Sequence, residues 1–132
     1  MERNRGTGGS CYLVTVEDSF SAAHALAGYD GDCEHLHGHN WVVLLTVSGE
    51  KLDEIGILID FRELKKLLRA CLAEFDHTNL SVHPIFSKIN PSAENIAKYI
   101  FDKLHGAIMQ HGCELTEVAV AETPNSTATY RP

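Results

Sequence analysis

Three histidines, one thiol and one carboxylate lie within the seven residues 33–39, which read Cys-Glu-His-Leu-His-Gly-His. His37 and His39 are separated by one glycine and are followed at once by an aromatic and aliphatic run, which is typical of a strand. Side chains two residues apart on a strand project from the same face, so the two imidazoles should point the same way. Together with a third nitrogen from elsewhere in the chain, they match the ligand set of a catalytic zinc site whose fourth position is open.

His24 is the candidate for that third nitrogen. It follows a β-branched and aromatic stretch that predicts a strand over about 10–19, ending in residues 20–24. A second strand is predicted over about 39–47, and neighbouring strands of a meander can bring His24 to the histidine pair. The competing interpretation is a closed structural site with Cys33 or His35 as the fourth ligand. A chain of 132 residues can close a core without a metal, so a catalytic Zn²⁺ is favoured.

Titratable residues at three further places in the sequence are candidates for proton transfer or ligand binding. Cys33 would be an unligated thiol close to a cation, which favours a thiolate able to take a proton; the alternative is an inert loop cysteine. In the adjacent pair Asp76 and His77, the carboxylate can orient an imidazole for proton transfer. Glu122 ends an otherwise apolar strand, where a carboxylate is costly unless it binds a group such as the N–H edge of a guanidine-like heterocycle. Its alternative is a surface acid at the end of a strand.

The predicted elements that position these residues come in pairs of one type along the chain. Asp60 followed by Glu63 is a capping-box pattern, and apolar residues at helical spacing continue to Phe75. A second helix is predicted from the cap-like segment 90–94 to about Gln110, with His111 and glycine as its stop. Strands over about 115–123 and 127–131 complete the order β-β-α-α-β-β. The order predicts an α+β domain over residues 10–132, with an antiparallel four-stranded sheet and two helices on one face, after a flexible segment 1–9.

Composition excludes several classes of partner. The chain has 11 Lys and Arg against 18 Asp and Glu, a formal net charge of -7, so we expect neither nucleic acid nor anionic membrane as a partner. The longest apolar run is too short to span a bilayer, and the first ten residues lack the apolar region of a signal peptide. The four cysteines form no CxxC pair, which argues against a disulfide scaffold. These features predict a cytoplasmic location.

Six short blocks of the sequence form a recognisable set: Phe20-x-Ala22-Ala23-His24, Cys33-x-x-x-His37-Gly38-His39, Ile59-Asp60-Phe61, Asp76-His77, Pro91-Ser92-Ala93-Glu94 and Glu122-Thr123. In order and spacing they resemble those of the 6-pyruvoyltetrahydropterin synthase and 6-carboxytetrahydropterin synthase family. The resemblance covers about residues 11–131. It implies a tunnelling fold (T-fold), in which sheets join side by side into a barrel and two trimers stack as a homohexamer.

The resemblance also implies a role for each matching residue. The family's zinc ligands fall on His24, His37 and His39. Its general base falls on Cys33, its proton relay on Asp76 and His77, its pterin-anchoring glutamate on Glu122, and pocket residues on Ser92 and Glu94. The implied substrate is 7,8-dihydroneopterin triphosphate, and the implied product is a 6-pyruvoyl- or 6-carboxytetrahydropterin; a bacterial source would favour the 6-carboxy product of the queuosine route.

Glu34 is a departure that adds a second hypothesis. In a branch of the family that serves folate synthesis, a glutamate at this position resembles a replacement for the cysteine, and the substrate side chain is cleaved to give 6-hydroxymethyl-7,8-dihydropterin. This chain has both Cys33 and Glu34, and the two bases differ in reach and softness, so either could direct the outcome. Glu34 could equally be a solvated loop acid. A third hypothesis is a non-catalytic pterin-binding or zinc-stabilised interaction module.

Overall fold

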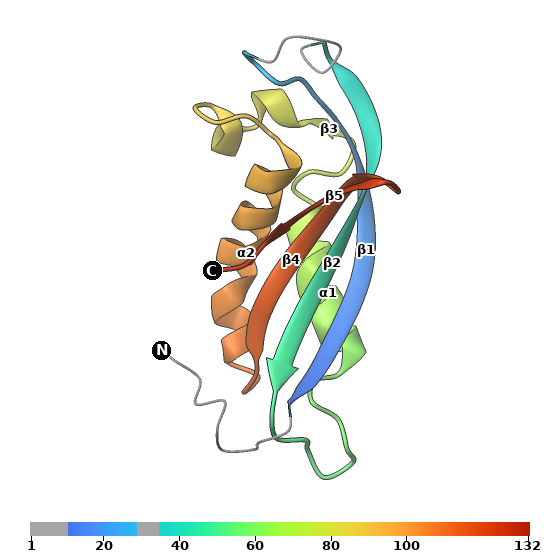
Figure 1. Ribbon diagram of the computed structural model, residues 1–132, viewed down its shortest axis with the longest axis vertical. Helices are drawn as coiled ribbons and strands as arrows, with labels where there is room; N and C mark the ends of the chain where they lie inside the picture. Colours follow the sequence, from blue (N-terminus) through green and yellow to red (C-terminus); the bar gives the residue numbers. More distant parts are fainter. Residues whose placement is uncertain (1–10, 29–34) are drawn as a thin grey trace.

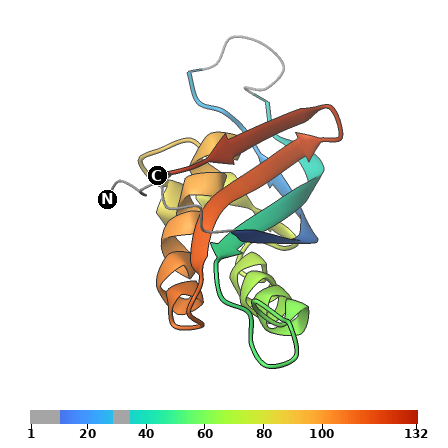
Figure 2. The same cartoon turned by 60° about the horizontal axis from the view of Figure 1, so that its bottom comes forward.

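Five strands form one sheet in the order β3-β1-β2-β4-β5, and two helices cover one of its faces (Figures 1 and 2). The structure is a computed structural model, and it describes residues 11–28 and 35–132. The elements are β1 (Tyr12–His24), β2 (His37–Gly49), α1 (Phe61–Leu72), β3 (Thr78–Asn79), η2 (Leu80–Val82), η3 (Pro84–Phe86), α2 (Ala93–Met109), β4 (Glu114–Thr123) and β5 (Ser126–Tyr130). The predicted α+β class, with two helices on one face, is confirmed.

The sheet differs from the predicted four-stranded antiparallel one because β3 adds a fifth, parallel strand. It pairs with the end of β1 at Ala22↔Thr78 and Ala23↔Asn79. Two residues are too short to show any alternation of apolar and polar side chains, so the sequence contains no strand pattern here. The sheet is therefore mixed, and the chain just after Asp76 and His77 lies against the edge of β1.

The first two strands are longer than predicted, and their extra residues carry the histidines. β1 continues through a segment of small residues to His24, and thirteen residues of β1 pair with β2, from Tyr12↔Gly49 to His24↔His37. Small side chains have weak strand preference, but a long antiparallel ladder outweighs that local preference. This register places His24 directly opposite His37 and places Ala22 opposite His39.

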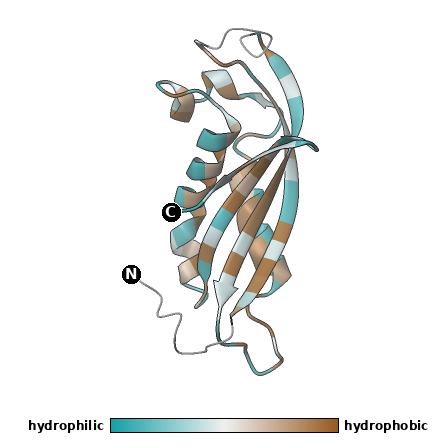
Figure 3. Ribbon diagram, viewed as in Figure 1, coloured by the Kyte–Doolittle hydropathy of each residue, from teal (hydrophilic) through white to brown (hydrophobic). Residues whose placement is uncertain are grey.

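The core lies between the helices and one face of the sheet. On β1 the buried residues are even-numbered, such as Phe20 and His24, and on β2 they are odd-numbered up to Val47, such as Trp41 and Val43. Their alternation with polar residues appears as brown and teal bands along the strands in Figure 3. The rings of Phe20 and Trp41 stack with centroids 5.9 Å apart. His37 and His39 share the parity of Trp41, so the histidines extend the core face beyond its apolar part.

Helix α2 begins at Ala93, inside the predicted cap-like segment 90–94. Ser92 is the N-cap, and its hydroxyl accepts a hydrogen bond from the Asn95 N–H at 3.2 Å. The Asn90 amide instead pairs with the backbone of Ala27, accepting from its N–H at 3.0 Å and donating to its carbonyl at 2.9 Å. Pro91 therefore lies before the helix, where its carbonyl is free for a side-chain partner.

Two other predicted ends of helices are confirmed. Asp60 caps α1, because its carboxylate accepts a hydrogen bond from the Arg62 N–H at 2.8 Å. Gly112, just past α2, has a φ of +79°, a conformation that glycine adopts without steric cost. In the part of the chain that the structure describes, no helix is long and apolar enough to cross a membrane.

Candidate metal centre and active site

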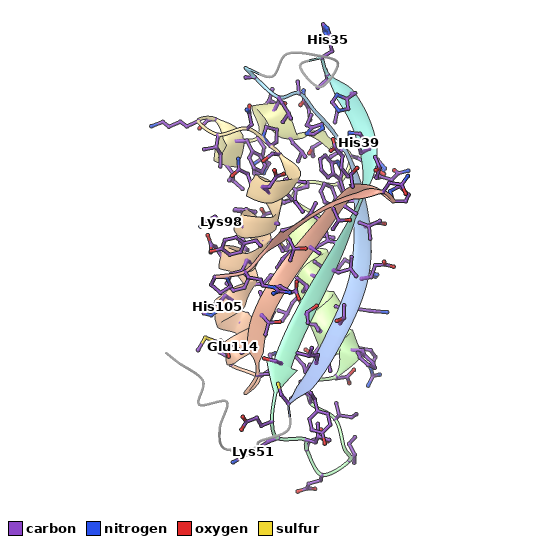
Figure 4. All side chains as sticks on the ribbon, viewed as in Figure 1. His35, His39, Lys51, Lys98, His105 and Glu114 are labelled. Carbon is purple, nitrogen blue, oxygen red and sulfur yellow. The ribbon has the colours of Figure 1, made fainter. Side chains whose placement is uncertain are left out.

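Four donor side chains meet at one end of the sheet. His24 is the last residue of β1, His37 and His39 open β2, and Glu122 lies near the end of β4. Because β2 pairs with both β1 and β4 in antiparallel fashion, these strand ends lie together. Figure 4 shows His35 at the outer tip of this end of the molecule and His39 further in.

The spacing of the donor atoms fits a single metal ion. His24 Nε2 lies 3.0 Å from both His37 Nε2 and Glu122 Oε1. The same carboxylate oxygen lies 2.8 Å from His39 Nε2 and 3.9 Å from His37 Nε2. All four donor atoms lie within 4.8 Å of one another. A tetrahedral zinc ion with bonds of about 2.0–2.2 Å places its ligand atoms roughly 3.3 Å apart, which is within the observed range.

The tautomers of two histidines are set by backbone carbonyls. Pro91 O accepts a hydrogen bond from His24 Nδ1 at 2.8 Å, and His35 O accepts one from His37 Nδ1 at 2.7 Å. A neutral imidazole carries one ring hydrogen, so each Nε2 then presents a lone pair. Two lone pairs 3.0 Å apart repel unless a cation lies between them. Carbonyl partners of this kind are the usual support for metal-binding imidazoles.

His39 supplies a further sign that a ligand belongs here. Its Nε2 is buried and makes no hydrogen bond with any described residue, although Glu122 Oε1 is 2.8 Å away, because the two groups are not aligned. Burial lowers the pKa of His39, and the neighbouring histidines lower it further against the opposing effect of Glu122. His39 Nε2 is thus a buried atom in a side chain that is 19% exposed, and a set of three histidines and one carboxylate suits zinc.

Trp41 fixes the rings of this cluster from the core side. It is fully buried, and its indole N–H donates to the carbonyl of Ala22 at 3.1 Å. Its ring lies nearly perpendicular to those of His24 and His39, with centroids 4.8 and 5.3 Å away. The tryptophan therefore limits how far either imidazole can turn.

The Asp76–His77 pair forms a second titratable site on the edge of β1. Asp76 Oδ1 accepts a hydrogen bond from the Ser21 N–H at 2.9 Å and lies 3.0 Å from His77 Nδ1. The His77 N–H in turn donates to Ser21 O at 2.6 Å. The bond from Ser21 is the main cause that lowers the pKa of Asp76, and His77 adds to it. The pair therefore presents an ionised carboxylate beside an exposed imidazole.

This pair lies beside the end of β1 that carries the metal centre, where β3 pairs with Ala22 and Ala23. A hollow of about 380 Å³ next to His77 is lined by residues of both β1 and β2, including Ser21, Asn40 and the metal-site residue His39. Within residues 11–28 and 35–132, no hydrogen bond or ion pair joins Asp76 or His77 to the histidine cluster. Asp76 and His77 thus lie at a hollow that His39 also lines, and their role as a proton relay stays a prediction.

The other predicted site residues have varied positions. Cys33 and Glu34 lie outside the described residues. Ser92 caps α2, and Glu94 is exposed in the first turn of that helix. His35 is exposed, and its backbone carbonyl accepts the hydrogen bond from His37 Nδ1.

Sequence reasoning missed two contributors to the metal centre. Glu122 was predicted to contact the pterin, yet its carboxylate lies among the histidine nitrogens. Its position two residues after buried Val120 was the available signal, since it shares the core face. The Pro91 carbonyl had no signal in the sequence, because its contact with His24 joins residues 67 apart.

The fold and this centre define a class: an α+β T-fold protein with a metal site of three histidines and one glutamate at its strand ends. Comparison with known proteins agrees. The 6-pyruvoyl tetrahydropterin synthase family model matches residues 13–132. The chain belongs to this family, and it is a lyase of the type that the family represents.

Relatives named for two different activities are similar to this chain to about the same degree. The 6-carboxy-5,6,7,8-tetrahydropterin synthase of Bacillus subtilis is 37% identical over 119 residues, covering 85% of this chain and 80% of that protein. The 6-pyruvoyl tetrahydrobiopterin synthase of Homo sapiens is 34% identical over 141 residues, covering 96% of each. The solved structure of Caenorhabditis elegans 6-pyruvoyl tetrahydropterin synthase matches with a TM-score of 0.83 at 31% identity, covering 93% of this chain and 96% of that one.

Proposed function

We propose that this chain is a zinc-dependent lyase that acts on 7,8-dihydroneopterin triphosphate and forms 6-carboxy-5,6,7,8-tetrahydropterin or 6-pyruvoyltetrahydropterin. The observation that carries the proposal is the convergence of the histidine Nε2 atoms, two of them held in the metal-binding tautomer by backbone carbonyls. The family match supports a pterin substrate, and both products occur among relatives of similar identity.

The metal centre would bind and orient the side chain of the substrate. His24, His37 and His39 would hold the zinc ion, which when bound supplies Lewis-acid polarisation of an oxygen. Glu122, at the same centre, is an acceptor for the N–H edge of a pterin, with Ser92 and Glu94 as further pocket residues. The ligands come from rigid strand ends, which suits precise placement of a substrate.

Proton transfer would fall to groups outside the metal cluster. Cys33, four residues before His37, is the proposed general base. Asp76, as an ionised carboxylate beside His77 Nδ1, would hold the ring so that its other nitrogen exchanges a proton. The pair is exposed, so that nitrogen is accessible.

A second candidate reaction is cleavage of the substrate side chain to give 6-hydroxymethyl-7,8-dihydropterin, with Glu34 as the base. The observation that favours it is the direct succession of Cys33 and Glu34, which offers two bases one residue apart. A carboxylate and a thiolate differ in reach, so each would address a different proton of the same substrate.

Assembly into a homohexamer is part of the proposal. Among residues 11–28 and 35–132, β2 alone pairs with residues 12–21 of β1, because β3 reaches Ala22 and Ala23 alone. The far side of β5 is likewise without a partner strand among the described residues. Unpaired strand edges of this length favour pairing between subunits. Sedimentation analysis of the zinc-loaded protein would show a hexamer, whereas a monomer would contradict this part.

The deciding experiment is identification of the product by mass spectrometry after incubation with 7,8-dihydroneopterin triphosphate. We expect a 6-carboxy- or 6-pyruvoyltetrahydropterin from the native protein and none from Cys33→Ala. If Glu34→Ala alone loses a hydroxymethyl product, that reaction belongs to Glu34. A zinc-loaded protein inert toward this substrate would refute the lyase, and unfolding of the domain on chelation would favour the interaction module.

A further inference from the structure

The metal centre offers four protein donors, which is one more than a catalytic zinc site needs. Structural zinc sites are closed by four protein ligands, whereas catalytic sites keep one position for water or substrate. Here Glu122 Oε1 lies 2.8 and 3.0 Å from the Nε2 atoms of His39 and His24. If all four donors bind the ion in a tetrahedral centre, a substrate oxygen can enter only when one donor leaves or when the ion expands to five ligands. A donor that is free to move would open the centre without the expansion.

The histidines are held too firmly to be that donor. His24 is 1% exposed, and its ring is fixed by the Pro91 carbonyl and packed against Trp41. His37 is fixed by the carbonyl of His35. His39 packs against Trp41, with ring centroids 5.3 Å apart. Each imidazole would have to break a contact outside the cluster in order to turn away.

Glu122 differs from the histidines in three respects. Its side chain is 28% exposed, and its only hydrogen bond or ion-pair partners among the described residues are the cluster histidines. It also lies at an irregularity of the sheet: the register between β4 and β5 runs from Ala121↔Thr127 to Thr123↔Ser126, so Glu122 is an extra residue in its strand. The extra residue of a bulge is left without a partner in the ladder, and bulges recur next to active sites.

We propose that Glu122 is an exchangeable fourth ligand, which completes the metal centre in the substrate-free enzyme and leaves the ion when a pterin binds. The inference rests on the proposed function for the identity of the incoming ligand. Three neutral imidazoles and one carboxylate leave a divalent centre with a net charge of +1. A released carboxylate regains a full negative charge, for which the N–H edge of the pterin is the matching partner. One side chain thereby couples entry of the substrate to opening of the centre.

The test uses cobalt as a spectroscopic substitute for zinc in the full-length protein. We expect Glu122→Gln to change the visible absorption of the substrate-free cobalt form and to weaken zinc binding at least about tenfold in a chelator competition. Glu122→Asp keeps the charge but shortens the side chain, so it should give the same spectrum as Glu122→Gln. Glu117→Gln is the matched control, because Glu117 lies on the same strand and pairs with Arg131 instead. Its spectrum and zinc affinity should equal those of the native protein.

The second arm adds neopterin, which has the pterin ring and side-chain hydroxyls but no triphosphate. Neopterin should change the visible spectrum of the native cobalt form. With neopterin bound, the native protein and the Glu122 variants should give the same spectrum. The proposal is overturned if Glu122→Gln, shown to be folded by circular dichroism, keeps the native spectrum and zinc affinity, or if bound neopterin leaves the native spectrum unchanged. These readouts need no turnover, so a failure of the lyase assay alone would refute the proposed reaction and not the exchange.

Discussion

His77 has a left-handed backbone conformation, so glycine at this position should give a more stable protein than alanine. Its φ is +59°, and it is the one residue other than glycine with a positive φ in the described part of the chain. The conformation is held by the bonds that Ser21 makes with Asp76 and with the His77 N–H. His77→Ala and His77→Gly both remove the imidazole, whose side chain is 81% exposed. The difference in stability between these two variants therefore reports the cost of the left-handed backbone conformation.

The expected difference in the free energy of unfolding is about 1 kcal/mol. A left-handed conformation costs a residue with a Cβ roughly 1–2 kcal/mol, and the greater freedom of glycine in the unfolded chain offsets roughly 0.5–1 kcal/mol of the gain. For a chain of 132 residues, 1 kcal/mol corresponds to a shift of about 3–4 °C in the midpoint of thermal unfolding.

Urea denaturation of the two zinc-loaded variants, followed by circular dichroism at one protein concentration, measures this difference. Ala70→Gly is the control, because Ala70 is exposed within α1, where glycine should cost roughly 0.5–1 kcal/mol. The sign should thus reverse between positions 70 and 77. Both His77 variants should also lose lyase activity, because both lack the imidazole of the proposed proton relay. Strained backbone conformations occur at functional sites, where they lower stability. If His77→Ala proves as stable as His77→Gly while the control behaves as expected, this reasoning is refuted.

Three further predictions concern the metal centre, the core beneath it and the contact between the helices. His24→Ala should abolish stoichiometric zinc binding, measured by elemental analysis, whereas His35→Ala should retain it because His35 contributes only its carbonyl. Trp41→Phe should lower the free energy of unfolding by about 2–3 kcal/mol in urea denaturation, through a lost buried hydrogen bond and a residual cavity; an unchanged value would contradict this. The hydrogen bond from Lys103 lowers the pKa of Glu74 below its ordinary value of 4.5. The ionised Glu74 therefore stabilises the folded protein at pH values above 4.5. This stabilisation is lost as the pH falls toward the lowered pKa, so the free energies of unfolding of the native protein and of Glu74→Gln should converge on acidification.

The three histidine ligands could be predicted because a period of two fixes the face of a strand locally. His37 and His39 share a face with Trp41, and the pairing of the two strands brings His24 opposite His37. The helices followed from their caps and apolar spacing. The contacts that fix the tautomers did not, because the Pro91 carbonyl reaches His24 only after Asn90 has bound the backbone near the end of β1. Such contacts depend on the tertiary fold and have no local pattern.

The bulge at Glu122 shows most sharply where local reasoning ends. Val118, Val120 and Glu122 follow a regular alternation, so the sequence predicts that the carboxylate simply continues the buried face. The extra residue exists only relative to β5, where Ala121 and Thr123 face partners that are adjacent in the chain. In unbroken register, the last residues of β4 would pair with a strand on each side. The bulge instead leaves Glu122 out of the hydrogen-bonded ladder. The residue that breaks the register is thus the same one whose carboxylate oxygen lies near three histidines, and its lack of a ladder partner is a property of strand pairing that no single strand encodes.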